Sequence, residues 1–115
     1  MAPEGFAAYV RDCLDCGSVQ LVNGGKTVRK VALCGGAGGS LLSSALRAGA
    51  DAFVTGEAKH NQMLDAKAAG LTLVAAGHHH TEQPVMENLQ KILAQKFPQV
   101  EFLLSECGTA PSVSL

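Results

Sequence analysis

Three apolar stretches of the chain each run into a polar or glycine-rich loop, and each loop opens a predicted helix. The stretches cover residues 28–34, 51–56 and 71–77, and their loops read CGGAGGS, TGEAKH and GHHHTE. Such alternation of strands and helices is typical of α/β proteins with a mainly parallel sheet. Loops that leave the carboxyl ends of parallel strands gather at one edge, where binding sites form. We therefore predict an α/β domain, with a mainly parallel or mixed sheet flanked by helices and a site at one edge.

The remaining elements follow from hydrophobic spacing and turn residues. At 115 residues the chain has the usual length of one domain. We predict a single domain over residues 1–105 and a mobile polar tail over 106–115. The further expected elements are a helix over 6–14 closed by Gly17, a strand over 18–22, helices over 41–49, 57–70 and 85–96, and a last strand over 100–104.

Composition and charge exclude some classes of function. The net charge is −1 and no run of basic residues occurs, which argues against nucleic-acid binding as a primary role. No apolar run approaches the length of a transmembrane helix, and the N-terminus lacks a signal-peptide pattern. We expect a protein of the cytoplasm that does not bind membranes.

The four cysteines allow two interpretations. Cys13 and Cys16 form a CxxC pair, which can be a redox centre or half of a zinc site. However, Cys13 falls on the apolar face of a predicted helix, and no second CxxC completes four ligands. We therefore predict reduced, structural thiols at these positions and at Cys34 and Cys107.

The glycine loop is a candidate binding site for a phosphate-containing small molecule. Its candidate residues are Gly36, Gly38, Gly39 and Ser40, because bare backbone N–H groups at a helix start attract anions and Ser40 is a natural cap. The loop is neither a Walker A motif nor a convincing GxGxxG fingerprint. A tight strand-to-helix turn is the favoured interpretation of the loop taken alone.

The segment GHHHTE is a candidate metal site. His78 leaves a strand, and Glu82 falls in the first helical turn after a predicted Thr81 cap, so both side chains can point over the sheet edge. Imidazole and carboxylate groups are ligands that zinc, manganese, iron and nickel accept. The alternative is a capped polar loop, because the helix dipole also favours a carboxylate there.

The other polar residues nearby have supporting roles in this hypothesis. Glu57 and His60 are acid/base candidates at the neighbouring loop, and we take Glu57 as the candidate catalytic residue. His79 and His80 cannot both share the direction of His78 in an extended segment, so one of them is expected to support a ligand. A solvated helix start explains Glu57 and His60 nearly as well.

Three linked motifs resemble one known family. VRKVALCGGAGGSLL, ADAFVTGEAKHNQMLDA and GLTLVAAGHHHTEQPVMENL are similar, in order and spacing, to the C-terminal half of the NIF-three-like family, from about residue 5 to about residue 105. These proteins are GTP cyclohydrolase I type 2 homologues that form hexamers with a dinuclear metal centre. The resemblance implies that His78 and Glu82 are metal ligands.

The same resemblance shows a departure from the family pattern. The N-terminal half, which supplies a histidine pair and an aspartate to the metals, has no counterpart here, and His60 stands beside the position, Asn61, where relatives often carry histidine. The resemblance thus implies a metal-dependent hydrolase site completed by a missing half, a partner or a homo-oligomer such as a trimer or hexamer. The alternative is a non-catalytic metal-handling or assembly module.

Overall fold

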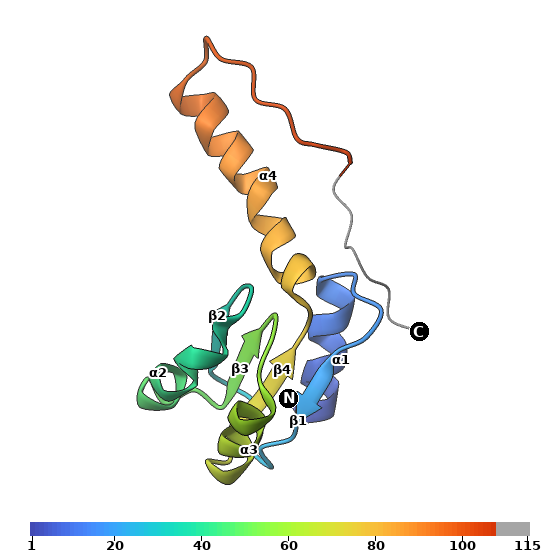
Figure 1. Ribbon diagram of the computed structural model, residues 1–115, viewed down its shortest axis with the longest axis vertical. Helices are drawn as coiled ribbons and strands as arrows, with labels where there is room; N and C mark the ends of the chain where they lie inside the picture. Colours follow the sequence, from blue (N-terminus) through green and yellow to red (C-terminus); the bar gives the residue numbers. More distant parts are fainter. Residues whose placement is uncertain (108–115) are drawn as a thin grey trace.

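A four-stranded mixed sheet forms the centre of the computed structural model, which describes residues 1–107 (Figure 1). The strand order is β1-β4-β3-β2, with β1 antiparallel to β4 and the other neighbours parallel. This arrangement confirms the predicted mixed α/β sheet. The strands are β1 Gln20–Val22, β2 Val31–Cys34, β3 Ala52–Thr55 and β4 Thr72–Ala75.

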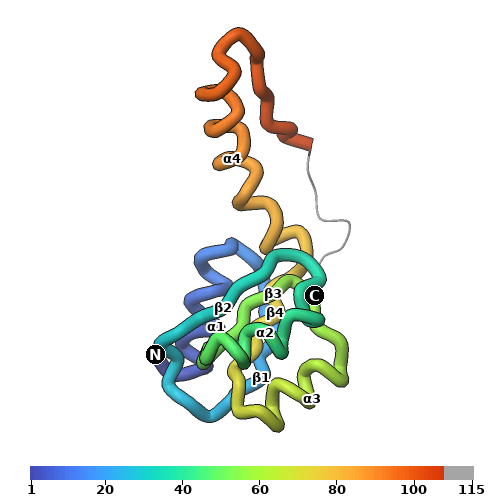
Figure 2. Tube along the Cα trace, turned by 90° about the vertical axis from the view of Figure 1, so that its left-hand side faces the viewer, coloured from blue at the N-terminus to red at the C-terminus, as the bar shows by residue number. Residues whose placement is uncertain are grey.

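Helices cover both faces of the sheet. The helix α1 packs on one face, while the helices α2 and α3 lie on the other (Figures 1 and 2). A long helix, α4, projects away from the sheet. The helices are α1 Pro3–Cys13, the 3-10 turn η1 Gly38–Leu41, α2 Leu42–Arg47, α3 His60–Ala68 and α4 His78–Lys96.

The central strands β3 and β4 supply apolar side chains to two separate cores. On one face, Phe6 and Val10 of α1 pack in a cluster with Val74. On the other face, Phe53 and Leu73 pack in a cluster that includes residues of α2 and α3. Because side chains alternate between faces along a strand, strands covered on both sides must be apolar throughout. This explains why β4, all of which is buried, is apolar from Leu73 to Ala75, with Thr72 as its one polar residue.

The predicted strand over 100–104 is wrong. Residues 101–105 form no ladder with any described strand, although Phe102 accepts a hydrogen bond from the Gln90 side chain of α4 at 2.6 Å. The reason is positional, because this segment follows the far end of α4, away from the sheet (Figure 1). Residues 108–115 of the predicted tail lie outside the described residues.

Two predicted helix ends also shift. The helix α1 ends at Cys13, and the chain turns through Asp15, whose φ of 48° is left-handed, so Gly17 is not the residue that ends it. The helix α3 begins at His60, because the TGE loop extends further than predicted. No helix of the described residues is long and apolar enough to cross a membrane.

The four cysteines carry free thiols. Cys16 is buried beneath α1, and burial raises the pKa of its thiol, which keeps it protonated and unreactive. Cys13 is exposed despite its place on the apolar side of the helix.

Asp51 fixes the entry to β3. The backbone N–H groups of Arg29 and Lys30 donate to its carboxylate at 3.1 and 2.9 Å, and its own N–H donates to the Lys30 carbonyl at 2.8 Å. The hydrogen bonds from Lys30 and Arg29 lower the pKa of Asp51 below its ordinary value of 3.8. The ionised side chain therefore aligns the start of β2 with the start of β3.

We predict that Asp51→Ala lowers the melting temperature at neutral pH. A depressed carboxyl pKa contributes stability that is fully present above 3.8 and is lost as pH falls through the lower, folded-state pKa. The gap in melting temperature between the wild type and the variant should therefore shrink in acid. Thermal unfolding across the acid range measures it, with Asp65→Ala as a control that removes an exposed carboxylate from α3. A gap that stays constant in acid would contradict this role.

Candidate metal centre

The three loops predicted to meet at one edge do so around Gly36. The carbonyl of Gly36 accepts hydrogen bonds from the N–H groups of Gly56 at 2.9 Å and Glu57 at 3.1 Å. Its N–H donates to the Thr81 hydroxyl at 3.0 Å. One residue of the glycine loop thus ties the TGE loop to the first turn of α4.

His78 and Glu82 lie one helical turn apart on the same side of α4. The helix begins directly at His78, because Gly77 has a φ of 87° and turns the chain straight from β4 into α4. The two side chains meet with His78 Nε2 and Glu82 Oε1 3.2 Å apart. They form a helical i, i+4 pair, unlike the predicted arrangement of a strand end and a capped helix start.

Thr81 is not the N-cap that the sequence predicted. It lies inside the first turn of α4, and its hydroxyl is 3.0 Å from the carbonyls of both Gly77 and His78. The same hydroxyl accepts the Gly36 N–H. Thr81 therefore locks the glycine loop against the helix start.

Glu57 approaches His78 from the other side of the imidazole ring. Its Oε1 lies 3.2 Å from His78 Nδ1, so the ring stands between two carboxylates. The three side chains are about half exposed, at 48% for His78, 59% for Glu57 and 56% for Glu82. The group is therefore open to solvent and to a small ligand.

Glycines permit this close approach. Gly36 has a φ of 66°, and a β-carbon at this position would fall against Glu82 Oε1 and 3.2 Å from His78 Nε2. At Gly56 a β-carbon would lie 2.9 Å from His78 Cα. Side chains at these two positions would push α4 away from the sheet edge. The glycines thus form the floor on which His78 and Glu82 rest.

The glycine loop is less free to hold a phosphate than its sequence indicates. Gly36 and Gly38 donate their N–H groups to the hydroxyls of Thr81 and Thr55, at 3.0 and 2.9 Å. Gly36, Gly38 and Gly39 are buried. Ser40 is exposed, but it lies inside η1 and forms no cap hydrogen bond. Phosphate binding stays a prediction, whereas a tight structural turn accounts for these contacts.

Thr55 is a residue that motif reasoning missed. Its side chain is fully buried at the end of β3, where its hydroxyl donates to the Gly36 carbonyl at 3.1 Å and accepts from Gly38. The only sequence signal is a threonine that directly precedes a glycine at the end of an apolar strand.

The other histidines lie apart from this group. His79 and His80 pack edge-to-face, with ring centroids 5.6 Å apart, and line a separate hollow with Asp15 and Glu87. His60 is exposed at the start of α3. Within residues 1–107 no group of three or more His, Cys, Asp or Glu side chains is arranged to hold a metal ion. The chain by itself thus brings together one imidazole and its two carboxylate neighbours.

Comparison with known proteins identifies the family of the chain. The sequence model of Duf34/NIF3 (NGG1p interacting factor 3) matches residues 1–111. The chain belongs to the Duf34/NIF3 family. This confirms the resemblance that the three motifs indicated.

Relatives in this family are considerably longer than this chain. A GTP cyclohydrolase 1 type 2 homolog of Pseudomonas aeruginosa is 36% identical over 107 residues, which cover 93% of this chain and 42% of that protein. A crystal structure of a Staphylococcus aureus protein superimposes with a TM-score of 0.88 at 32% identity, over 100% of this chain and 34% of that one. A Bacillus cereus protein related to NIF3 gives a TM-score of 0.80 at 33% identity, over 100% of this chain and 33% of that one. This Duf34/NIF3 chain therefore spans less than half the length of these relatives.

We predict that Gly36→Ala destabilises this Duf34/NIF3 domain by more than about 1 kcal/mol, because it combines a left-handed backbone with a collision against Glu82 and His78. Gly25→Ala is the matched control, since Gly25 has a φ of 80° but open space around its β-carbon position. Urea unfolding of both variants measures the difference. Equal losses would show that the close approach to α4 contributes nothing.

Proposed function

We propose that the chain binds a divalent metal ion through His78 and Glu82. The observation that carries this proposal is the 3.2 Å distance between His78 Nε2 and Glu82 Oε1. Two ligand atoms on one tetrahedral zinc ion, at bond lengths of about 2.0–2.1 Å, are about 3.3 Å apart. The two side chains therefore fit one ion with little movement. Zinc, manganese, iron and nickel all accept this pair of ligands.

Glu57 supports the same proposal as a positioning residue. Metal-bound histidines usually donate their second ring N–H to a carboxylate, which fixes the tautomer and the direction of the ring. Glu57 stands 3.2 Å from His78 Nδ1, in the place of such a partner. This contact leaves Nε2 free for the ion. We therefore propose that Glu57 orients His78, in place of the catalytic role that the sequence predicted.

The proposed activity is metal-dependent hydrolysis at this edge of the sheet. A bound divalent ion would act there as a Lewis acid on a phosphoryl or carbonyl oxygen of the substrate. The half-exposed side chains give a small molecule access. Relatives carry the name GTP cyclohydrolase 1 type 2 homolog, so nucleotides are the first substrate class to test.

A second candidate function is metal handling or assembly without catalysis. It is favoured by the small ligand set, because catalytic zinc sites usually have three protein ligands and no group of three exists within residues 1–107. In either function we propose that the remaining ligands come from another copy of the chain or from a partner. The free thiols suit a reducing compartment such as the cytoplasm.

We predict weak zinc or manganese binding that depends on His78 and Glu82. His78→Ala and Glu82→Ala should each abolish measurable binding, because each removes one of two ligands. Glu57→Gln should weaken it by about 10–100-fold, since it removes the charge that orients the ring. Calorimetric titration of tag-free protein measures all three.

His80→Ala is the matched control, because it removes an adjacent histidine that lines a different hollow. It should leave the affinity unchanged. If His80→Ala abolishes binding while His78→Ala does not, the wrong histidine has been assigned. If no variant changes the affinity, the segment is a polar helix start that binds no metal.

Turnover separates the two candidate functions. We predict that the metal-loaded protein hydrolyses a member of a panel of nucleotides and phosphoesters, and that His78→Ala reduces the rate at least about 100-fold through loss of the Lewis acid. The panel is measured with zinc and with manganese, and with the His80→Ala control. Stoichiometric metal binding without turnover would favour the handling function.

We propose in addition that the chain associates with itself. Long apolar side chains are exposed on β2, on α4 and beyond α4, among them Leu33, Met86, Ile92 and Leu103. On α4 these side chains belong to a helix that buries none of its residues, and a contiguous exposed apolar surface marks a contact site between proteins. The family resemblance implies a trimer or hexamer.

A further inference from the structure

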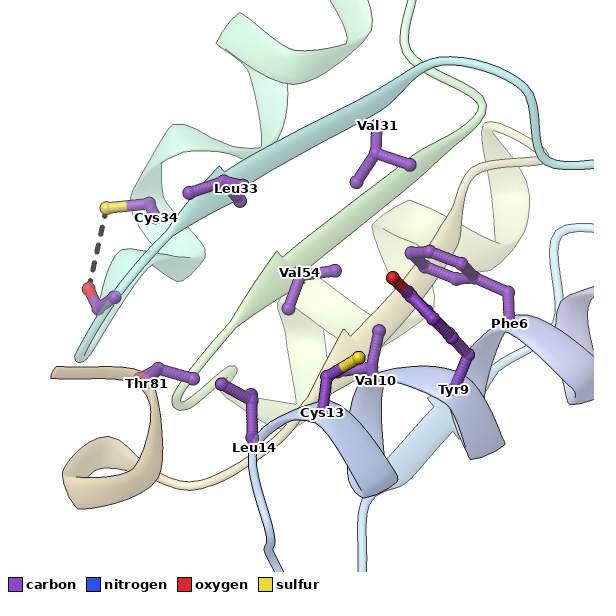
Figure 3. Close-up of a pocket in the computed structure, with 11 residues that line it drawn as sticks. Phe6, Tyr9, Val10, Cys13, Leu14, Val31, Leu33, Cys34, Val54 and Thr81 are labelled. Atoms are coloured by element: carbon purple, nitrogen blue, oxygen red, sulfur yellow. Dashed lines mark hydrogen bonds between the residues drawn. The ribbon is translucent and has the colours of Figure 1, made fainter. Parts of the chain in front are cut away.

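An apolar groove of about 350 Å³ lies between α1 and the edge of the sheet (Figure 3). The helix α1 covers the inner strands, but β2 extends beyond it. Val31 and Leu33 of β2 form one wall and remain 40% and 79% exposed. Tyr9 and Cys13 of α1 stand on the opposite wall, and Val54 lies between the walls (Figure 3). One face of β2 is therefore left without a covering layer.

The backbone of β2 is uncovered as well. Among the described residues β2 pairs only with β3, so it is an edge strand of the sheet. Its residues Val31–Cys34 contain no charged side chain and no proline, either of which would discourage the addition of a further strand. The strand thus offers both an open hydrogen-bonding edge and an apolar face.

A second unpartnered element lies at the far end of α4. This helix has 19 residues, hence a length of about 28 Å, and buries none of them. Beyond it, residues 100–105, which we call the arm, form no ladder with any described strand, and their Phe102 carbonyl accepts a hydrogen bond from the Gln90 side chain of α4. The arm has the apolar pattern of a strand, and its Leu103 is 79% exposed. It contributes no residue to the groove of its own chain.

We propose that the arm of one copy of the chain adds as a further strand to β2 of a second copy. Every second side chain of the added strand then lies beside Val31 and Leu33, on the face of the sheet that forms the groove. Backbone pairing at an open edge, with pockets for alternate side chains, is an established mode of strand addition. This inference rests on the proposed self-association and identifies its surface.

The distribution of charged residues supports the arm of a second copy as the partner of β2. The exposed carboxylates of Glu101 and Glu106 flank the apolar part of the arm, while Arg29 and Lys30 directly precede β2. In a parallel pairing Glu101 lies near the basic pair, and in an antiparallel pairing Glu106 does. Either direction brings opposite charges together.

The docked arm also meets the candidate metal centre. The groove ends at Cys34, Gly35 and Thr81, and the last of these forms part of the first turn of α4. A β-carbon at Gly35 would lie 3.5 Å from Glu82 Cγ, which shows how near this end is to the proposed ligands. A second copy seated there shields one side of the metal centre from water.

Sedimentation velocity of three leucine-to-aspartate variants tests the proposal. Leu33→Asp alters the groove, Leu103→Asp alters the arm, and Leu64→Asp is the matched control on α3, where Leu64 is 57% exposed. The wild type and the control should associate in the micromolar range. The groove and arm variants should each raise the dissociation constant at least about tenfold. The double variant should be no weaker than either single one, because both changes remove one contact.

Mixing the two variants gives the sharpest result. A Leu33→Asp copy keeps an intact arm and a Leu103→Asp copy keeps an intact groove, so the mixture should associate more tightly than either variant alone. Hydrogen exchange of the wild type adds a measurement that needs no variant, with amide protection at residues 31–34 that rises with protein concentration.

The outcomes separate the two claims. A wild type that stays monomeric overturns self-association and this inference together. An associating wild type whose groove and arm variants associate equally well retains self-association but overturns the arm as the occupant. A mixture that shows no recovery also overturns the pairing of arm with groove.

Discussion

The hydrogen bonds around Gly36 hold the functional edge of the molecule together. Its carbonyl receives the N–H groups of Gly56 and Glu57, and its N–H reaches the Thr81 hydroxyl. The backbone of Gly36 thus connects three loops that are far apart in the sequence. The left-handed conformation at Gly36 aims these groups in the required directions, and the missing side chain leaves room for His78 and Glu82. Any other residue at this position would collide with the side chains of the two proposed ligands.

The sheet and the meeting of the loops could be predicted because they depend on local patterns. Apolar strands followed by glycines, and helices with periodic apolar faces, specify the α/β alternation, and parallel strands bring their carboxyl ends to one edge. His78 and Glu82 could be selected because their chemistry is distinctive. Their relation as neighbours on one helical turn could not, because Thr81 resembles a helix cap while the turn is made by the positive φ of Gly77.

Other features depend on contacts that a sequence pattern does not contain. The segment over 100–104 has the composition of a strand, yet a strand exists only where another strand offers hydrogen bonds, and none lies within reach in the described chain. Glu57 resembles a general base, and its place beside His78 Nδ1 emerges only from the distance between them. The structural role of Thr55 could not be predicted either. A buried threonine takes the same place in the sequence pattern of a strand as an apolar residue does.

The attachment of α4 has a mechanical consequence. The helix is joined to the sheet at Gly77, carries His78 and Glu82 in its first two turns, and has a total length of about 28 Å over which no residue is buried. The proposed ligands therefore lie at the end of the helix that is attached to the sheet, and the other end is free to move. A tilt of about 5° at the base displaces the tip by about 2 Å, by the same helical geometry. Anchoring the tip therefore restricts the angle at which the imidazole meets Glu57, so forces applied far from the sheet are transmitted to the ligand geometry.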